Sequence, residues 1–245
     1  MKYVFGVDIG GTTVKIGLFD VEGNVLDKWE IPTRTENDGE KILPDVADSI
    51  REKMKQMDKD AIAGVGVGAP GPIDAGGVVH RAVNLGWKTF NVKETLEALI
   101  NLPVRAGNDA NVAALGEMWM GGGKGYKDLV VVTLGTGVGG GIIVDGRMIS
   151  GSTGAAGEIG HIHVDDTETD ICNCGNKGCL EQFASATGIT RLANKKLAST
   201  DMDSVLRGGE VSAKTVFDAV KARDPLAMEV AEQFGKYLGD AHAAV

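Results

Sequence analysis

The sequence lacks the features that mark membrane, secreted and nucleic-acid-binding proteins. No apolar run approaches the roughly 20 residues of a membrane helix, and Lys2 leads directly into a strand-like segment rather than a signal peptide. The three cysteines are an odd number and lie within residues 172–179, which argues against disulfide cross-links. Acidic residues outnumber basic ones by 34 to 25, and the net charge of −9 argues against binding to nucleic acid or a membrane surface. We therefore expect a cytoplasmic protein with neither of these partners.

Two familiar nucleotide-binding signatures are missing or misleading. The chain contains no G-x-x-x-x-G-K-[ST] motif, so it is not a P-loop protein. Gly135, Gly137 and Gly140 do form a G-x-G-x-x-G pattern, but the next residues, Gly-Ile-Ile-Val-Asp-Gly, contain three consecutive β-branched residues and end at a turn. A dinucleotide site needs a helix directly after its glycines, so this segment argues against a dehydrogenase.

Glycine, by contrast, is abundant, at 36 of 245 residues, and most glycines fall in turns between regular elements. The composition, 43% apolar and 24% charged, is ordinary for a globular protein with room for one large domain or two lobes. Hydrophobic periodicity predicts both strands and helices. Strands are expected at 3–9, 14–19, 25–31, 62–67 and 104–106, and helices at 40–57, 92–100, 110–120, 184–195, 212–223 and 225–238.

A segment near the start of the chain recurs at an offset of 125 residues. Ile9-Gly10 matches Leu134-Gly135, and Leu18-Phe19-Asp20 matches Ile143-Val144-Asp145. In each copy a glycine turn leads to a strand, a hairpin turn and a further short strand, which indicates a duplicated unit. We predict an α/β fold of two lobes with a cleft between them, comprising residues 1–122 and 123–245.

The two glycine turns, Asp8-Ile-Gly-Gly-Thr-Thr13 and Gly135-Thr-Gly-Val-Gly139, can each direct several backbone N–H groups at one anion. Asp8 ends an otherwise apolar strand, a position that favours a metal-binding or catalytic carboxylate. Each turn could instead be an ordinary tight hairpin, and Asp8 could simply cap it. The duplication favours phosphate binding, because turns from two lobes can hold one triphosphate.

Four motifs together resemble the ROK family of repressors, uncharacterised frames and kinases. They are Asp8-Ile-Gly-Gly-Thr12, Gly107-Asn-Asp-Ala-Asn111, Glu158-Ile-Gly-His161 and the pattern Cys172-x-Cys-Gly-x-x-Gly-Cys-x-Glu181. The resemblance covers the whole chain and is strongest to the family's bacterial glucokinases. It implies a duplicated actin-like ATPase fold (ribonuclease H-like, hexokinase-type) with a zinc loop in the second lobe. The implied activity is ATP-dependent phosphorylation of a hexose, above all of glucose at its 6-hydroxyl.

The resemblance also implies where nucleotide and sugar bind. The expected ATP contacts are Asp8, Gly10, Gly11, Thr12, Thr13, Lys15, Thr133, Gly135, Thr136 and Gly137, with Mg²⁺ accompanying ATP. Asp109 is the implied base on the sugar's primary hydroxyl, although taken alone it could be a helix N-cap. Asn108, Glu158, His161 and Glu181 are the implied ligands of the other hydroxyls, and the loop from Gly68 lines the pocket. Trp87 fits either that pocket or the core.

Cys172-Asn-Cys174-Gly-Asn-Lys-Gly-Cys179 places three thiols within eight residues, and one imidazole would complete a tetrahedral zinc site. His161 and His163 are two residues apart, so on a strand they would share a face and either could be the ligand. The family pattern favours His161. A site with four protein ligands has no open position, so the zinc would be structural.

The chain departs from the expected pattern near its end. By residue count the second lobe lacks one or two strand–helix units, so we expect the complete protein to be a kinase and the activity of these 245 residues to depend on the missing part. Alternatives are a kinase for another hexose, such as N-acetylmannosamine or fructose, or a non-catalytic sugar-binding or regulatory protein. A repressor would need a DNA-binding domain, and only Met1 and Lys2 precede the first strand. The family suggests a homodimer.

Overall fold

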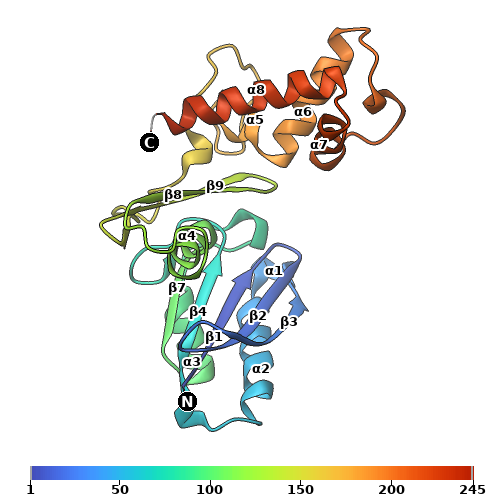
Figure 1. The fold of residues 1–245 in the computed structure, drawn as a ribbon. Coiled ribbons are helices and arrows are strands. Elements are labelled where there is room, and N and C mark those ends of the chain that lie inside the picture. Colours follow the sequence, from blue (N-terminus) through green and yellow to red (C-terminus); the bar gives the residue numbers. More distant parts are fainter. Residues whose placement is uncertain (1, 244) are drawn as a thin grey trace. The chain divides into compact units, whose positions relative to one another are not determined.

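A computed structural model describes residues 2–243 and 245 (Figure 1). Its contacts divide the chain into two compact units. Unit 1 comprises Met1–Val131 and Gly141–Gly157, and unit 2 comprises Val132–Gly140 and Glu158–Val245. The division into lobes at residues 122 and 123 stays a prediction. Among the described residues, no helix combines the length and the apolar character that crossing a membrane requires.

Unit 1 is built on a five-stranded mixed sheet in the order β3-β2-β1-β4-β7. The strands are β1 (Tyr3–Ile9), β2 (Thr13–Asp20), β3 (Val25–Pro32), β4 (Ile62–Ala69) and β7 (Val104–Asn108). The first three form antiparallel hairpins, whereas β4 and β7 run parallel to β1. The carboxyl ends of three parallel strands therefore meet at one edge of the sheet, the usual position of ligand sites in α/β folds.

Helices cover one face of this sheet and carry the core of unit 1. They are α2 (Ile42–Met54) and α3 (Val92–Ile100), which contact each other (Figure 1). Phe5, Val7 and Ile9 alternate along β1 with side chains on the same face, and they pack in one cluster with Val46 and Ile50 of α2. The predicted helix over 40–57 is shorter at both ends than expected. Short elements complete the unit: α1 (Glu36–Gly39), β5 (Val78–Val79), β6 (Phe90–Asn91), and the 3₁₀ turns Lys59–Ala61 and Val83–Leu85.

The strands of unit 1 also line an apolar groove of about 1580 Å³. Glycines replace large side chains there, and Gly6 of β1 is in register with Gly17 on one neighbouring strand and Gly66 on the other. Helix α4 (Asp109–Met120), which follows β7 directly, contributes Leu115 and the half-exposed Trp119 to the lining. Unit 1 thus combines a buried core with a long, open apolar surface.

The predicted repeat is present in the structure. Strands β8 (Leu129–Leu134), β9 (Val138–Val144) and β10 (Arg147–Met148) form a sheet in the order β10-β9-β8, the same succession of neighbours as β3-β2-β1. The turn between β8 and β9 contains Gly135 and Gly137, which correspond to Gly10 and Thr12 at the offset of 125. One hairpin design therefore occurs twice in the chain.

Four helices and a long loop form most of unit 2. The helices are α5 (Glu181–Ala184), α6 (Ala186–Ser199), α7 (Ala213–Lys221) and α8 (Pro225–His242), with 3₁₀ turns at Ile159–His161 and Val205–Gly208. Their core contains Phe183, Leu192, Val216, Leu226 and Val230. Each predicted helix after the cysteine-rich loop is present, and Ser185, Ser212 and Asp224 cap α6, α7 and α8 through side-chain bonds to backbone N–H groups.

Replacing Asp224 with alanine tests how much one buried cap stabilises unit 2. Its carboxylate accepts bonds from the backbone N–H groups of Ala227 and Val205 (2.9 Å each) and from the Ser204 hydroxyl (3.1 Å). The substitution removes the cap and leaves these donors without it, so we expect the free energy of unfolding in urea to fall by about 2–4 kcal/mol.

Asp218→Ala is the matched control, because that exposed carboxylate pairs with Lys214 on the surface of α7 and should change stability by less than about 1 kcal/mol. Burial opposes ionisation of Asp224, but its hydrogen bonds outweigh burial and lower its pKa. The difference in the free energy of unfolding between wild type and Asp224→Ala should therefore be largest at neutral pH. It should shrink as the pH falls through that lowered pKa. Equal losses in the two variants would contradict this role.

Candidate functional site

The first glycine turn joins β1 to β2 and is closed by a bond from the Gly10 N–H to the Thr13 carbonyl (3.0 Å). A Cβ atom at Gly10 would lie 2.9 Å from that carbonyl oxygen, so the tight closure requires glycine. Thr33 contacts the turn twice: its hydroxyl donates to the Gly10 carbonyl (2.7 Å) and its N–H to the Thr12 carbonyl (2.9 Å). The turn is thus rigidly held by backbone and hydroxyl bonds.

Asp8 and Asp109 lie near each other at the carboxyl ends of the parallel strands. Asp8 is in register with Gly68 of β4, and Gly68 with Gly107 of β7, which precedes Asn108 and Asp109. A Cβ atom at Gly68 would lie 2.7 Å from the Val112 Cγ2 atom, so glycine at this position lets α4 approach β4 closely. Its predicted place in the sugar pocket stays a prediction.

The environment of Asp109 suits a proton acceptor. Burial raises the pKa of this carboxyl group, and the nearby negative charge of Asp8 raises it further, against a bond from the Ala110 N–H (2.7 Å) to one carboxylate oxygen. Asp109 is the first residue of α4 and not its N-cap. Asn108 is the cap, because its Oδ1 accepts from the Asn111 N–H (3.1 Å).

Asn108 also fixes the neighbouring loop, since its Nδ2 donates to the Gly71 carbonyl (3.1 Å). One amide hydrogen and one lone pair of this side chain remain for a hydroxyl group. Sequence reasoning missed Asn111, whose Oδ1 is buried and, among the described residues, has no hydrogen-bond partner. Trp87 belongs to the core: it is 4% exposed and its Nε1 donates to the Gly39 carbonyl (3.2 Å).

In unit 2, His161 joins the three cysteines in one cluster. The Nδ1 or Nε2 atom of His161 and the Sγ atoms of Cys172, Cys174 and Cys179 all lie within 4.8 Å of one another. His163 belongs elsewhere, because its Nδ1 faces the Lys177 carbonyl (2.9 Å) and its Nε2 the Asp166 carboxylate (2.8 Å). The two histidines do not share a strand face as the alternation suggested, because His161 ends the 3₁₀ turn Ile159–His161.

The spacing of this cluster fits a tetrahedral zinc site. Zn–S bonds of about 2.3 Å and Zn–N bonds of about 2.0 Å imply edges of about 3.8 Å between sulfurs and about 3.5 Å between nitrogen and sulfur. The Cys174 and Cys179 sulfurs are 3.6 Å apart, and the Cys172 sulfur is 3.8 Å from His161 Nδ1. Burial raises the pKa of Cys172, and it raises that of Cys179 to about 12, so a bound cation would be needed to stabilise three thiolates together.

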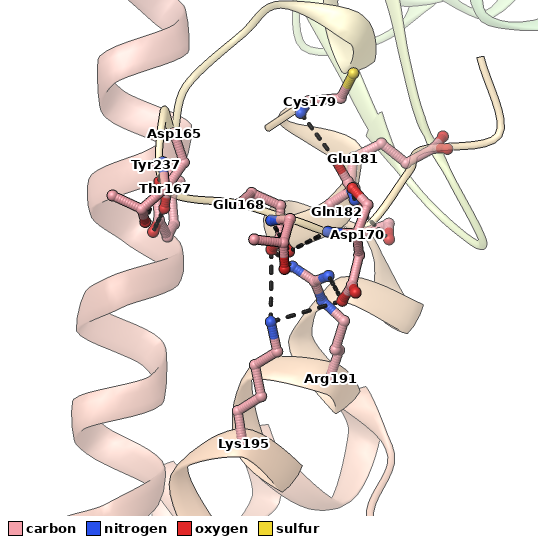
Figure 2. Close-up of polar contacts among 12 residues, drawn as sticks. Asp165, Thr167, Glu168, Asp170, Cys179, Glu181, Gln182, Arg191, Lys195 and Tyr237 are labelled. Atoms are coloured by element: carbon pink, nitrogen blue, oxygen red, sulfur yellow. Dashed lines mark hydrogen bonds and ion pairs between the residues drawn. The ribbon is translucent and has the colours of Figure 1, made fainter. Parts of the chain in front are cut away.

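Polar contacts hold the cysteine-rich loop to the helices of unit 2 (Figure 2). Gln182 accepts a bond from the Cys179 N–H (3.1 Å) and donates to the Asp170 carbonyl (3.0 Å). Arg191 of α6 pairs with Glu168 and with Asp170 (2.9 Å), and Lys195 lies 3.6 Å from the buried Glu168 carboxylate. These residues lie outside the recognised motifs, yet they fix the loop that contains the thiols.

Glu181 links the thiol cluster to the second glycine turn. One carboxylate oxygen accepts from the Val138 N–H (3.1 Å) and the other lies 4.0 Å from the Cys172 sulfur. A Cβ atom at Gly137 would lie only 2.2 Å from this carboxylate, so any larger residue there would have to displace Glu181 from its bond to Val138. Glu158 directly precedes the 3₁₀ turn that ends at His161, so three of the predicted sugar ligands gather in this part of unit 2.

The predicted site residues are therefore found in two groups. Asp8, Asn108 and Asp109 belong to unit 1 with the first glycine turn, whereas Glu158, His161 and Glu181 belong to unit 2 with the second. In each group a glycine turn, which can bind an anion through its backbone, occurs in the same unit as carboxylates that can accept hydrogen bonds from hydroxyl groups.

Comparison with known proteins agrees with the family resemblance. The chain is 43% identical to the glucokinase of Halalkalibacterium halodurans over 99% of its own length and 76% of that protein. A ROK family glucokinase from Streptomyces griseus, solved with glucose and AMPPNP, superposes with a TM-score of 0.79 and 33% identity, covering 99% of this chain and 78% of that one. A ROK family transcriptional regulator, a homolog of the E. coli MLC protein, superposes with a TM-score of 0.88 and 29% identity. That match covers 99% of this chain and 61% of the regulator.

The chain shares its α/β fold with these solved ROK family proteins. The family model described as "ROK family" matches residues 4–245. The match extends over nearly all of the sequence and includes both glycine turns, the Asp109 segment and the four-residue thiol–imidazole cluster. The chain belongs to the ROK family.

Proposed function

We propose that this protein transfers the γ-phosphoryl group of ATP to the 6-hydroxyl of a hexose and that glucose is its preferred acceptor. The observation that carries the proposal is the half-buried Asp109 carboxylate, with its raised pKa, at the sheet edge where the first glycine turn begins. The 43% identity to a glucokinase supports the choice of glucose.

Asp109 has the properties that this reaction requires of a general base. Its carboxylate accepts the proton of the attacking hydroxyl while the oxygen forms a bond to the γ-phosphorus and the bond to the leaving ADP oxygen breaks. Because burial and Asp8 raise its pKa, the carboxylate is more basic than an exposed aspartate. Asn108, which caps the same helix and directly precedes Asp109, has capacity to bind a sugar hydroxyl.

Backbone N–H groups of the two glycine turns are proposed to contact the ATP phosphates, together with the remaining residues of the nucleotide set. These are Asp8, Gly10, Gly11, Thr12, Thr13, Lys15, Thr133, Gly135, Thr136 and Gly137. Asp8 is an exposed carboxylate beside the first turn, and its oxygen atoms are ligands of the kind that Mg²⁺ prefers. A bound Mg²⁺ would offset the negative charge that develops on the phosphate oxygens.

The sugar hydroxyls distant from the reaction are assigned to Glu158, His161 and Glu181, with the Gly68 loop lining the pocket. Zinc bound by His161, Cys172, Cys174 and Cys179 would be structural, because four protein ligands complete its coordination. With Nδ1 toward the metal, the other imidazole nitrogen is available for a hydroxyl group. We also propose a homodimer, and lobes of residues 1–122 and 123–245, on the basis of the family.

A regulatory role is the second candidate. It is favoured by the TM-score of 0.88 to a transcriptional regulator, although this chain covers only 61% of that protein. Such a protein would bind sugar without phosphorylating it. Kinases for N-acetylmannosamine or fructose are the alternatives within the same reaction class.

A panel of hexoses incubated with Mg²⁺ and ATP separates these candidates. We expect ADP release and a sugar 6-phosphate, identified by ³¹P NMR, with glucose giving a higher kcat/KM than fructose or N-acetylmannosamine. Calorimetry on the same protein measures glucose binding independently. Glucose binding without ADP release would support the regulatory role, and a higher kcat/KM for another hexose would overturn the choice of glucose.

Asp109→Asn tests the proposed base. We expect kcat to fall by about 10²- to 10⁴-fold, the usual contribution of a general base, with glucose affinity changed little. In the wild type, kcat/KM should rise with pH through an inflection above about 3.9, the ordinary pKa of aspartate, because only the ionised carboxylate accepts the proton.

Asp8→Asn should move this inflection to lower pH, since it removes a negative charge that raises the Asp109 pKa. Asp48→Asn, an exposed site on α2, is a control that should leave the pH profile unchanged. Retention of near-normal kcat in Asp109→Asn would show that another group is the base.

Paired histidine variants test the metal site. His161→Asn should lose zinc, measured by elemental mass spectrometry after gel filtration, because His161 and not His163 lies with the thiols. His163→Asn should keep zinc, since its imidazole contacts Asp166 and Lys177 instead. Removing zinc from the wild type with a chelator should lower the melting temperature. Equal zinc content in both variants would contradict the assignment of His161.

A further inference from the structure

In each glycine turn, one backbone carbonyl accepts a hydrogen bond from a threonine hydroxyl that lies outside the recognised motifs. In unit 1, Thr33 Oγ1 donates to the Gly10 carbonyl (2.7 Å). In unit 2, Thr187 Oγ1 donates to the Thr136 carbonyl (3.0 Å), across 51 residues of sequence. In each duplicated hairpin a threonine hydroxyl thus holds one carbonyl of the turn, and in the second hairpin that carbonyl is one position later in the repeat, because Thr136 corresponds to Gly11.

These bonds determine the direction of backbone N–H groups. In a planar trans peptide, the carbonyl of one residue and the N–H of the next point in opposite directions. Because Thr33 holds the Gly10 carbonyl, the Gly11 N–H is directed away from Thr33. Because Thr187 holds the Thr136 carbonyl, the Gly137 N–H is directed away from α6. Fixed N–H groups of this kind form anion-binding turns.

A second bond orients the preceding peptide of the unit 2 turn. The Ala186 N–H, at the first position of α6, donates to the Gly135 carbonyl (2.8 Å), which directs the Thr136 N–H away from the helix. Two successive N–H groups, those of Thr136 and Gly137, are therefore oriented by the start of α6. The helix is used here as a support for the turn.

The neighbouring hydroxyl of Ser185 is engaged elsewhere. Ser185 is fully buried; its hydroxyl donates to the Glu181 carbonyl (2.7 Å), and its oxygen accepts from the Gly188 N–H (2.9 Å) as the cap of α6. Because Ser185 has one hydroxyl proton and gives it to Glu181, the bond to the Thr136 carbonyl depends on the proton of Thr187 itself. The Thr187 and Ser185 oxygens are 2.9 Å apart, so Thr187 lies directly beside the helix cap.

We propose that Thr33 and Thr187 are positioning residues for the phosphates of ATP: each holds a carbonyl of a glycine turn so that the next N–H faces the anion. The inference rests on the proposed kinase function and extends it to residues that contact no substrate. It assigns the supporting role to the hydroxyl group and not to the bulk of the side chain, which makes valine and serine the informative substitutions.

Thr187→Val keeps the shape of the side chain and removes its donor. We expect the KM for ATP to rise by about five- to tenfold, the effect of losing one hydrogen bond, with kcat, glucose affinity and zinc content close to the wild type. Thr187→Ser restores the hydroxyl and should restore the KM for ATP. Thr33→Val and Thr33→Ser should behave in the same way at the first turn.

Ala186→Pro removes the other donor without disturbing the helix. Proline is favoured at the first helical position, and Ser185 before it has φ −76° and ψ 168°, which a residue preceding proline can adopt. The KM for ATP should again rise. The matched control is Ala213→Pro, at the first position of α7, whose preceding residue Ser212 is also extended.

Thr190→Val is the control for the threonine variants, because Thr190 Oγ1 donates to the Ala186 carbonyl within α6 (2.9 Å). It should leave the KM for ATP unchanged. Calorimetry with inorganic tripolyphosphate and with a non-hydrolysable ATP analogue should show the same order of affinities as the KM values, and far-UV circular dichroism checks folding.

The outcomes separate this inference from the function on which it rests. If the wild type neither turns over nor binds ATP, the kinase proposal fails and the inference fails with it. If the wild type is an ATP-dependent kinase but Thr187→Val and Thr33→Val bind tripolyphosphate normally, only the inference is overturned. An equal rise in the KM for ATP in Thr187→Ser and Thr187→Val would also overturn the inference, because the hydroxyl would then have no specific role.

Discussion

The hydrogen bond from the Val138 N–H to the Glu181 carboxylate (3.1 Å) is the contact on which the candidate site of unit 2 depends. The same carboxylate lies 4.0 Å from the Cys172 sulfur and occupies the space that a side chain at Gly137 would need. Glu181, itself a proposed sugar ligand, thereby connects the second glycine turn to the thiol cluster. Since a buried or half-buried carboxylate needs hydrogen-bond donors, the turn and the carboxylate stabilise each other.

The cysteine-rich loop has little regular structure of its own and is fixed from outside. Gln182 bonds to the loop at two points, and Arg191 pairs with two acidic side chains, one of them the buried Glu168. A buried carboxylate requires a partner of opposite charge, and Arg191 also packs over the Phe183 ring at 5.3 Å. The thiols and His161 are therefore positioned by the helices of unit 2 as well as by any metal they hold.

The duplicated hairpins show how one backbone design acquires two different supports. Thr33 follows β3 directly and supports the first turn from a neighbouring strand end, whereas the second turn is supported by the start of α6. In both cases a carbonyl is held so that N–H groups point the other way. The constraint comes from the planarity of the peptide bond, so different elements can satisfy it equally well.

Local patterns in the sequence were sufficient for most of the fold and for the three clustered thiols, whereas the assigned substrate contacts stay predictions. Alternation predicted the strands, helical spacing the helices, and the offset of 125 the second hairpin, because each depends on residues close together in the chain. The motifs around Asp109 and Cys172 identified the family, which the comparisons confirmed. Tertiary structure decided the rest: His161 and not His163 joins the thiols, Asn108 and not Asp109 caps α4, and Thr33 and Thr187 support the turns. The Asn108 cap is a local contact over three residues, but adjacent Asn and Asp side chains are both good caps and the sequence does not distinguish them. The other assignments depend on a 3₁₀ turn that breaks strand alternation, or on contacts spanning 23 and 51 residues, and neither leaves a periodic or local signature in the sequence.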